Sequence, residues 1–161
     1  MRGDGTHREL NEPAGPVPTS GSTPIRVRYA ECDPMGVAHH ASYAPWLEIA
    51  RTELLREAGS SYAAMEAAGV FLVVTRMEIR YRRPIRYDDL LEVRVVAEPK
   101  GAVRIRHTYE VVVVERGGGP ATRDGKAVPL DGVCAVAETE LACVDGTGKP
   151  RGLPAWLGGR A

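Results

Sequence analysis

The sequence is poor in the features that covalent scaffolds and membrane proteins need. Its three cysteines, Cys32, Cys134 and Cys143, are an odd number without C-x-x-C spacing, so they indicate neither a disulfide framework nor a zinc site. No run of residues approaches the roughly 18 apolar positions of a membrane span, and the N-terminus lacks the apolar core of a signal peptide. We therefore expect a soluble, cytoplasmic protein.

The chain also lacks net charge, because 21 Lys and Arg balance 21 Asp and Glu. A general nucleic-acid binder needs a basic excess, so that class is excluded, although a local basic patch for a phosphorylated ligand is not. A charge near zero also permits self-association. Of the 161 residues, 43% are hydrophobic and 26% charged, which is ordinary for one packed domain.

The first 23 residues have a composition of their own. They are rich in Gly, Pro, Ser and Thr and contain few apolar side chains, so burial cannot offset the entropy lost on ordering. We predict a flexible tail over residues 1–23 and a single folded domain over residues 24–157.

One long helix is predicted over residues 42–57. Its apolar residues recur at helical spacing and form a stripe for the core; they are Tyr43, Trp46, Leu47, Ala50 and Leu54. The charged residues of this helix, Arg51 included, lie largely off that stripe.

The other elements are strands. Alternating or apolar runs rich in Val, Ile and Thr predict strands over residues 25–29, 70–81, 90–98, 102–115 and 133–144. Short links between strands imply antiparallel neighbours. The economical architecture is an α+β fold in which an antiparallel sheet wraps around the helix. Its outer face and edges would still need cover, which favours oligomerisation.

The segment D-P-M-G places Asp33 in a turn a few residues before the helix. A carboxylate beside the unpaired N–H groups of a helix start can attack, and stabilise, a polarised carbonyl. An aspartate in such a turn can equally serve only to form the turn. His39 and His40 are not expected to bind a metal, because no third ligand lies at metal spacing and adjacent side chains point apart.

Three segments, taken together, resemble a known family. They are C-D-P-M-G-V-A-H-H-A-S-Y-A-P-W-L-E-I-A-R at 32–51, R-Y-R-R-P-I-R-Y-D-D-L-L-E-V at 80–93 and L-A-C-V-D-G-T-G-K-P-R-G-L-P at 141–154. In this order they are similar to the hotdog-fold acyl-CoA thioesterases of the 4-hydroxybenzoyl-CoA thioesterase type, over about residues 25–156. The resemblance implies a hotdog fold, hydrolysis of acyl-CoA without metal or redox cofactor, and assembly as a homodimer or homotetramer.

The resemblance also implies roles for single residues. Asp33 would be the catalytic carboxylate, acting as general base on water or as nucleophile, and the sequence does not choose between these. The backbone N–H of His40 would point at the thioester oxygen. Relatives often carry D-T-D where this chain has Glu31, Cys32 and Asp33, and an aromatic residue at the position of His39. The cues to an aromatic or an aliphatic acyl group conflict, so the acyl group stays open.

Substrate contacts are expected around this turn and from arginines. Gly36, Val37, His39 and Tyr43 are the candidates for binding the acyl thioester. The phosphates of CoA need Arg or Lys, and our candidates are Arg82 and Arg106, which otherwise are solvated strand residues. Two other functions stay open: a thioesterase for acyl-carrier protein, and a non-catalytic acyl-CoA-binding subunit, which would not need a carboxylate at a helix start.

Overall fold

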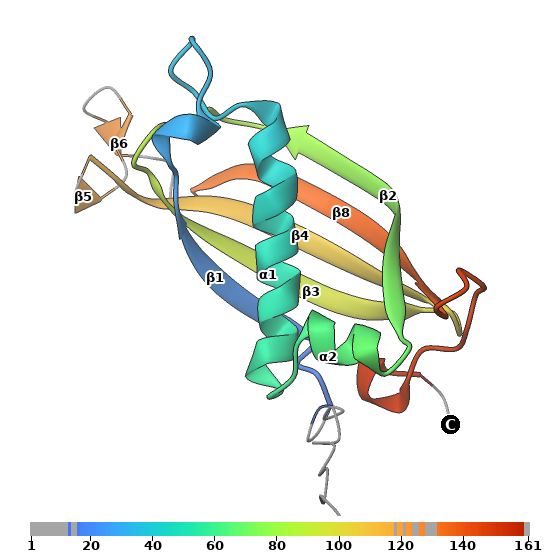
Figure 1. Ribbon diagram of the computed structural model, residues 1–161. Helices are drawn as coiled ribbons and strands as arrows, with labels where there is room; N and C mark the ends of the chain where they lie inside the picture. The colour runs from blue at the N-terminus through green and yellow to red at the C-terminus, as the bar shows by residue number, and fades with distance from the viewer. Residues whose placement is uncertain are drawn as a thin grey trace, which may run out of the picture.

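The computed structural model describes residues 13, 16–117, 119–120, 122–123, 126–127 and 132–159. An antiparallel sheet in the order β1-β3-β4-β8-β2 forms the body of the protein, with one helix lying across its concave face (Figure 1). The main strands are β1 (Ser20–Arg26), β2 (Phe71–Tyr81), β3 (Leu90–Lys100), β4 (Arg104–Arg116) and β8 (Val133–Val144). The expected α+β hotdog architecture is therefore confirmed.

The remaining elements are short strands, helices and 3-10 turns. The two-residue strands are β5 (Gly119–Pro120), which pairs with β4, and β6 (Thr122–Arg123) and β7 (Lys126–Ala127), which pair with each other. The helices are α1 (Tyr43–Glu57) and α2 (Tyr62–Ala67), and 3-10 turns occupy η1 (Tyr29–Glu31), η2 (His40–Ser42) and η3 (Ala155–Leu157). Among the described residues, no helix is long and apolar enough to cross a membrane. A cytoplasmic location stays a prediction.

The apolar stripe of α1 packs on the sheet as predicted. All five stripe residues are at most 3% exposed, so the helix contributes its whole apolar side to the core, where burial of each large side chain stabilises the fold by about 1.5–3 kcal/mol. Arg51 is also buried, at 8% exposure, and there the prediction that it lies off the buried side was wrong. The reason is that α2 covers the flank of α1 on which Arg51 lies, since Arg51 donates to Tyr62 of α2.

The strand β1 begins earlier than predicted. It starts at Ser20, so its first four residues fall in the segment that was expected to belong to a flexible tail. Ser20 pairs with Val96 and Arg26 with Leu90, and such a ladder uses backbone groups that need no apolar side chains. Residues 1–12 lie outside the described part of the chain, so the rest of the tail stays a prediction.

Candidate active site

The Asp33 turn holds its carboxylate in one orientation. The backbone N–H of Asp33 donates to the carbonyl of Val37 at 2.9 Å, and its carbonyl accepts from Gly36 at 2.9 Å. Its Oδ1 accepts from the N–H of Met35 at 2.9 Å. Gly36 has φ +75, and nothing lies within 4 Å of the position that a Cβ would take there, so glycine serves the left-handed backbone rather than a tight contact. Asp33 is therefore half-buried, and its carboxylate is anchored through one of its two oxygens, Oδ1.

Two further backbone hydrogen bonds hold this turn at the start of the helix. Ala38 donates its backbone N–H to Ile85 at 2.8 Å, and His39 donates its own to the carbonyl of Glu31 at 2.8 Å. The turn thereby projects at the N-terminal end of α1, where η2 leads into the helix (Figure 1). Nδ1 of His39 accepts from the N–H of Ala41 at 3.2 Å and caps η2. For the N–H of His40, no acceptor is found in the part of the chain that the structure describes.

Glu31 is a buried carboxylate that the sequence analysis did not single out. Its Oε1 accepts from Trp46 Nε1 at 3.0 Å and from the Arg28 guanidinium at 2.8 Å, and its Oε2 accepts from the Arg28 N–H at 2.7 Å. Its carbonyl also accepts from Ser42 Oγ at 2.9 Å. Burial alone would raise the pKa of Glu31, but the hydrogen bonds from Arg28 and Trp46 outweigh burial and lower it. Glu31 thus fixes the Asp33 segment against the first turns of α1.

Aromatic rings surround the helix start. The rings of His39 and His40 lie side by side, with centroids 3.9 Å apart, so the expectation that these side chains point apart was wrong; the 3-10 turn brings them together. Tyr81 of β2 reaches the carbonyl of His40 at 3.5 Å and meets the Tyr43 ring edge-on at 4.9 Å. Burial raises the pKa of Tyr43 well above its usual value, so its hydroxyl stays protonated.

No metal centre is found among these groups. In the described ranges, no cluster of three or more His, Cys, Asp or Glu side chains could hold an ion. The three cysteines are free thiols, and burial raises the pKa of Cys32 first, with the nearby charge of Asp33 adding to the effect. Cys32 is therefore a poor nucleophile beside the Asp33 turn.

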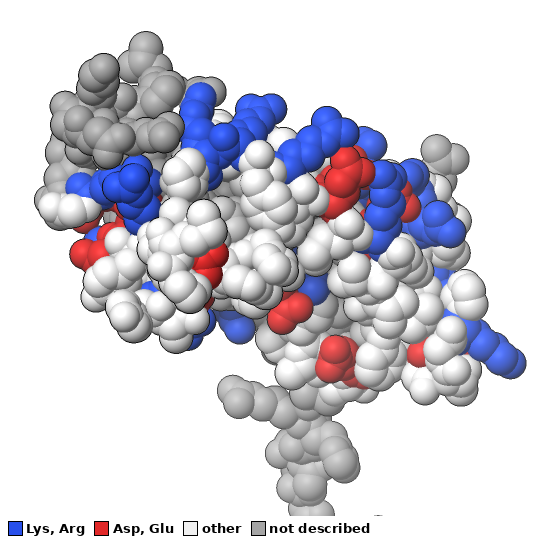
Figure 2. Space-filling model, turned by 90° about the horizontal axis from the view of Figure 1, so that it is seen from above, with Lys and Arg blue, Asp and Glu red and all other residues white. Residues whose placement is uncertain are grey.

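The two candidate arginines lie in different places. Arg82 is exposed just after β2, and its backbone N–H donates to Cys134 at 2.8 Å; within the described residues, its guanidinium has no acceptor. Arg106 lies on the face of the sheet away from α1 and pairs with Glu98 at 2.7 Å. Basic side chains gather along one margin of the end of the molecule that carries the start of α1 (Figure 2). Arg82 directly follows Tyr81, whose hydroxyl reaches the carbonyl of His40, whereas Arg106 lies on the outer face of the sheet.

The outer face of the sheet has a hollow of about 690 Å³. Its charged lining residues pair with one another, as in Arg76 with Glu78 at 2.6 Å and Arg94 with Glu110 at 3.5 Å. The hollow lies on the side of the sheet that faces away from α1, so it is separate from the Asp33 turn. Its paired charges leave it without an evident reactive group.

Comparisons with known proteins identify the family of this chain. The sequence matches the thioesterase-like superfamily over residues 27–160. The acyl-CoA thioester hydrolase YbgC of Escherichia coli is 34% identical over 132 residues, which cover 81% of this chain and 87% of that protein. The acyl-CoA thioesterase YbgC of Haemophilus influenzae is 40% identical over 83 residues, 50% of this chain and 61% of that protein. The solved structure of a DHNA-CoA thioesterase from Staphylococcus aureus has a TM-score of 0.69 and 31% identity, over 83% of this chain and 80% of that one.

The protein has an antiparallel sheet that wraps around one long helix, and it resembles known thioesterases in structure and in sequence. It is therefore a hotdog-fold thioester hydrolase. The chain belongs to the thioesterase-like superfamily.

Proposed function

We propose that the protein hydrolyses acyl-CoA to the free acid and CoA, with Asp33 as the catalytic carboxylate. The observation that carries the proposal is that the Asp33 turn comes just before η2, at whose start the His40 N–H has no acceptor among the described residues. Relatives named as acyl-CoA thioester hydrolases support CoA as the carrier.

The chemistry follows from these two groups. The thioester carbonyl oxygen accepts from the His40 N–H, which is preoriented for the negative charge that develops on that oxygen. Asp33 acts on the carbonyl carbon, either by removing a proton from the attacking water or by adding to the carbon itself and forming a mixed anhydride that water then hydrolyses. Gly36, Val37, His39 and Tyr43 flank this position. No metal or redox cofactor enters either route.

The direct test is a panel of acyl-CoA thioesters, with release of the CoA thiol as the readout. Aromatic and aliphatic acyl groups of several lengths belong in the panel, together with the same acyl groups on acyl-carrier protein. Turnover of acyl-CoA supports the proposal, and faster turnover of the carrier-protein thioesters would favour the alternative carrier. Tight binding of acyl-CoA without thiol release would identify a binding subunit and overturn the proposal.

Arg82 is proposed to bind a phosphate of CoA. Arg82→Ala is expected to raise KM for acyl-CoA by up to about tenfold, since a lost hydrogen bond to a charged group costs about 1.5–3 kcal/mol and less when exposed. KM for a short thioester that lacks the nucleotide should not change, and only the acyl-CoA reaction should weaken with salt. Arg106→Ala is expected to have a smaller effect because Glu98 already holds that guanidinium. Equal salt sensitivity of both substrates would contradict a CoA phosphate site.

We also infer assembly as a homodimer or homotetramer through the edge strand β2. Among the described strands, β8 is the only partner of β2. The strand β2 also exposes apolar side chains, which are Val73, Val74, Met77 and Tyr81. An open apolar edge of 11 residues favours pairing with a second copy.

Light scattering should show at least a dimer for the wild type and a monomer for Met77→Arg. Val96→Arg, at a half-exposed position on the outer face of β3, is the control that keeps the dimer, and a monomeric wild type would rule out this assembly.

A further inference from the structure

A group of polar side chains is buried beneath the middle of α1. Arg51 and His107 are 8% and 4% exposed, respectively, and Tyr62 of α2 lies beside Arg51. The Arg51 guanidinium donates to the Tyr62 hydroxyl at 2.5 Å and lies 5.3 Å from the centre of its ring. Arg51 is also near enough to His107 to affect its pKa. We call Arg51, Tyr62 and His107 the Arg51–His107 cluster.

The hydrogen bonding of this cluster is incomplete. Nδ1 of His107 is buried and has no partner among the described residues. Arg51 carries five N–H donors, and its second acceptor is Glu48, at 3.1 Å, whose side chain is 66% exposed. A buried polar atom without a partner costs about 1–3 kcal/mol, so native proteins keep few of them and each has a cause.

Two polar side chains next to His107 already have partners. The Tyr109 hydroxyl and Thr139 Oγ1 lie 3.0 Å apart and pair with each other. His107 stacks on Tyr109, with ring centroids 6.1 Å apart, but makes no polar contact with it. The missing partner is therefore specific to His107.

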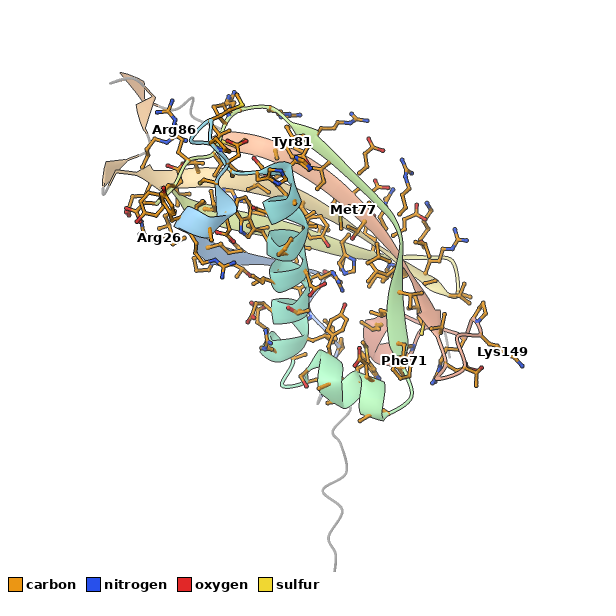
Figure 3. The ribbon with its side chains drawn as sticks, turned by 45° about the horizontal axis from the view of Figure 1, so that its top comes forward. Arg26, Phe71, Met77, Tyr81, Arg86 and Lys149 are labelled. Atoms are coloured by element: carbon orange, nitrogen blue, oxygen red, sulfur yellow. The ribbon has the colours of Figure 1, made fainter. Side chains whose placement is uncertain are left out.

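The row of residues that contains His107 reaches the edge strand β2. In the register of the sheet, His107 of β4 lies opposite Thr139 of β8, and Thr139 lies opposite Met77 of the edge strand β2. The three residues therefore form one row on the inner face of the sheet. Met77 and Tyr81, which shares that face, are 41% and 52% exposed, because α1 leaves this flank uncovered. Figure 3 shows Tyr81 near the N-terminal end of α1 and Met77 further along β2. Tyr81, beside the helix start, and Met77, in the row of His107, are four residues apart on β2, which corresponds to about 13 Å along the strand.

We propose that the Arg51–His107 cluster is a distal acyl subsite, which takes a hydroxyl group carried about 13 Å from the thioester carbonyl. This inference rests on the proposed acyl-CoA hydrolysis. A hydroxyl both accepts and donates, so one group can accept from Arg51 and donate to Nδ1 of His107. The substrate class is an acyl chain with a hydroxyl at its far end.

The charges of the cluster favour a neutral group over a carboxylate. Burial, with a smaller contribution from the Arg51 charge, lowers the pKa of His107 to about 4. The imidazole is therefore neutral at pH 7, and a ring nitrogen can accept a hydrogen bond. Glu48 already balances the charge of Arg51, so a carboxylate would bring an uncompensated charge into a buried site.

The test compares two CoA thioesters that span the same length, one with a terminal hydroxyl and one with a terminal methyl group. The wild type is expected to prefer the hydroxylated thioester by at least about tenfold in kcat/KM, because a site built for a hydroxyl rejects the analogue that lacks it. In His107→Leu and in Arg51→Met this ratio should fall toward one, through loss on the hydroxylated substrate alone. Tyr109→Phe is the matched control, since the hydroxyl it removes is already paired with Thr139, and it should keep the ratio.

The outcomes separate the subsite from the reaction. Hydrolysis of both thioesters at equal rates by the wild type, or an unchanged ratio in both variants, overturns the subsite and leaves the hydrolase intact. Absence of turnover with every acyl-CoA overturns the proposed function and the subsite with it. If His107→Leu fails to fold, Arg51→Met and Tyr62→Phe decide, and a ratio that survives both contradicts the proposal.

Discussion

Replacing Asp33 by asparagine is expected to lower kcat by about 10²–10⁴ and to change KM much less. The amide keeps the shape of the side chain and can still accept from the Met35 N–H, which the carboxylate holds at 2.9 Å. It cannot remove a proton from water or add to a carbonyl. The measurement is thiol release at saturating acyl-CoA, with circular dichroism to show that the fold is kept.

The chain offers a matched control for this variant. Asp145 forms a turn of the same kind, in which its N–H donates to Lys149 at 2.9 Å, its carbonyl accepts from Gly148 at 2.9 Å and its Oδ1 accepts from Thr147 at 2.8 Å. Lys149, in this turn, lies at the opposite end of the molecule from Tyr81 (Figure 3). Asp145→Asn should therefore leave kcat unchanged. Turnover of Asp33→Asn close to that of Asp145→Asn would show that Asp33 only forms a turn.

The two turns explain how much of the site the sequence could predict. D-P-M-G and D-G-T-G have the same backbone pattern, so the motif alone does not distinguish a catalytic aspartate from a structural one. What differs is the following segment, because only Asp33 precedes a helix start whose His40 N–H is free of acceptors among the described residues. The family resemblance made that distinction, and the catalytic role of Asp33 stays a prediction.

The fold was largely predictable for a similar reason. The stripe of α1 and the alternation of β4 are local periodicities, and both elements lie within one or two residues of their predicted bounds. The start of β1 was missed because Ser20 and Gly21 lack the apolar signal of a strand, and their pairing with Val96 and Val95 depends on a segment far along the chain.

The missed residues are polar groups, each with a partner in another element of the fold. Glu31 looks like a solvated turn residue until Trp46 and Arg28 are seen to enclose it. Arg51 looks like an exposed helix charge until Tyr62 covers it. His107 lies on the buried face of β4, and no sequence pattern indicated that its Nδ1 lacks a partner among the described residues. Such long-range contacts leave no local signal.

Acidification should lower the free energy of unfolding because His107 takes up a proton when the protein unfolds. Burial, and secondarily the Arg51 charge, lower the folded-state pKa of His107 from 6.5 to about 4. Between these values the unfolded chain binds a proton that the folded chain does not, so the free energy of unfolding falls as the pH falls. Each pKa unit corresponds to about 1.4 kcal/mol, so the full loss from this one group is about 3 kcal/mol.

The measurement is urea unfolding of the wild type and His107→Leu at neutral pH and near the folded-state pKa, at one fixed protein concentration because assembly also affects stability. The wild type should lose about 3 kcal/mol more than the variant over this range, since leucine cannot take up the proton. His39→Leu is the control, because His39 is exposed and should keep the wild-type acid sensitivity. Equal losses in the wild type and His107→Leu would mean that His107 titrates in the folded protein as it does in the unfolded chain, and that its imidazole is not held neutral beneath α1.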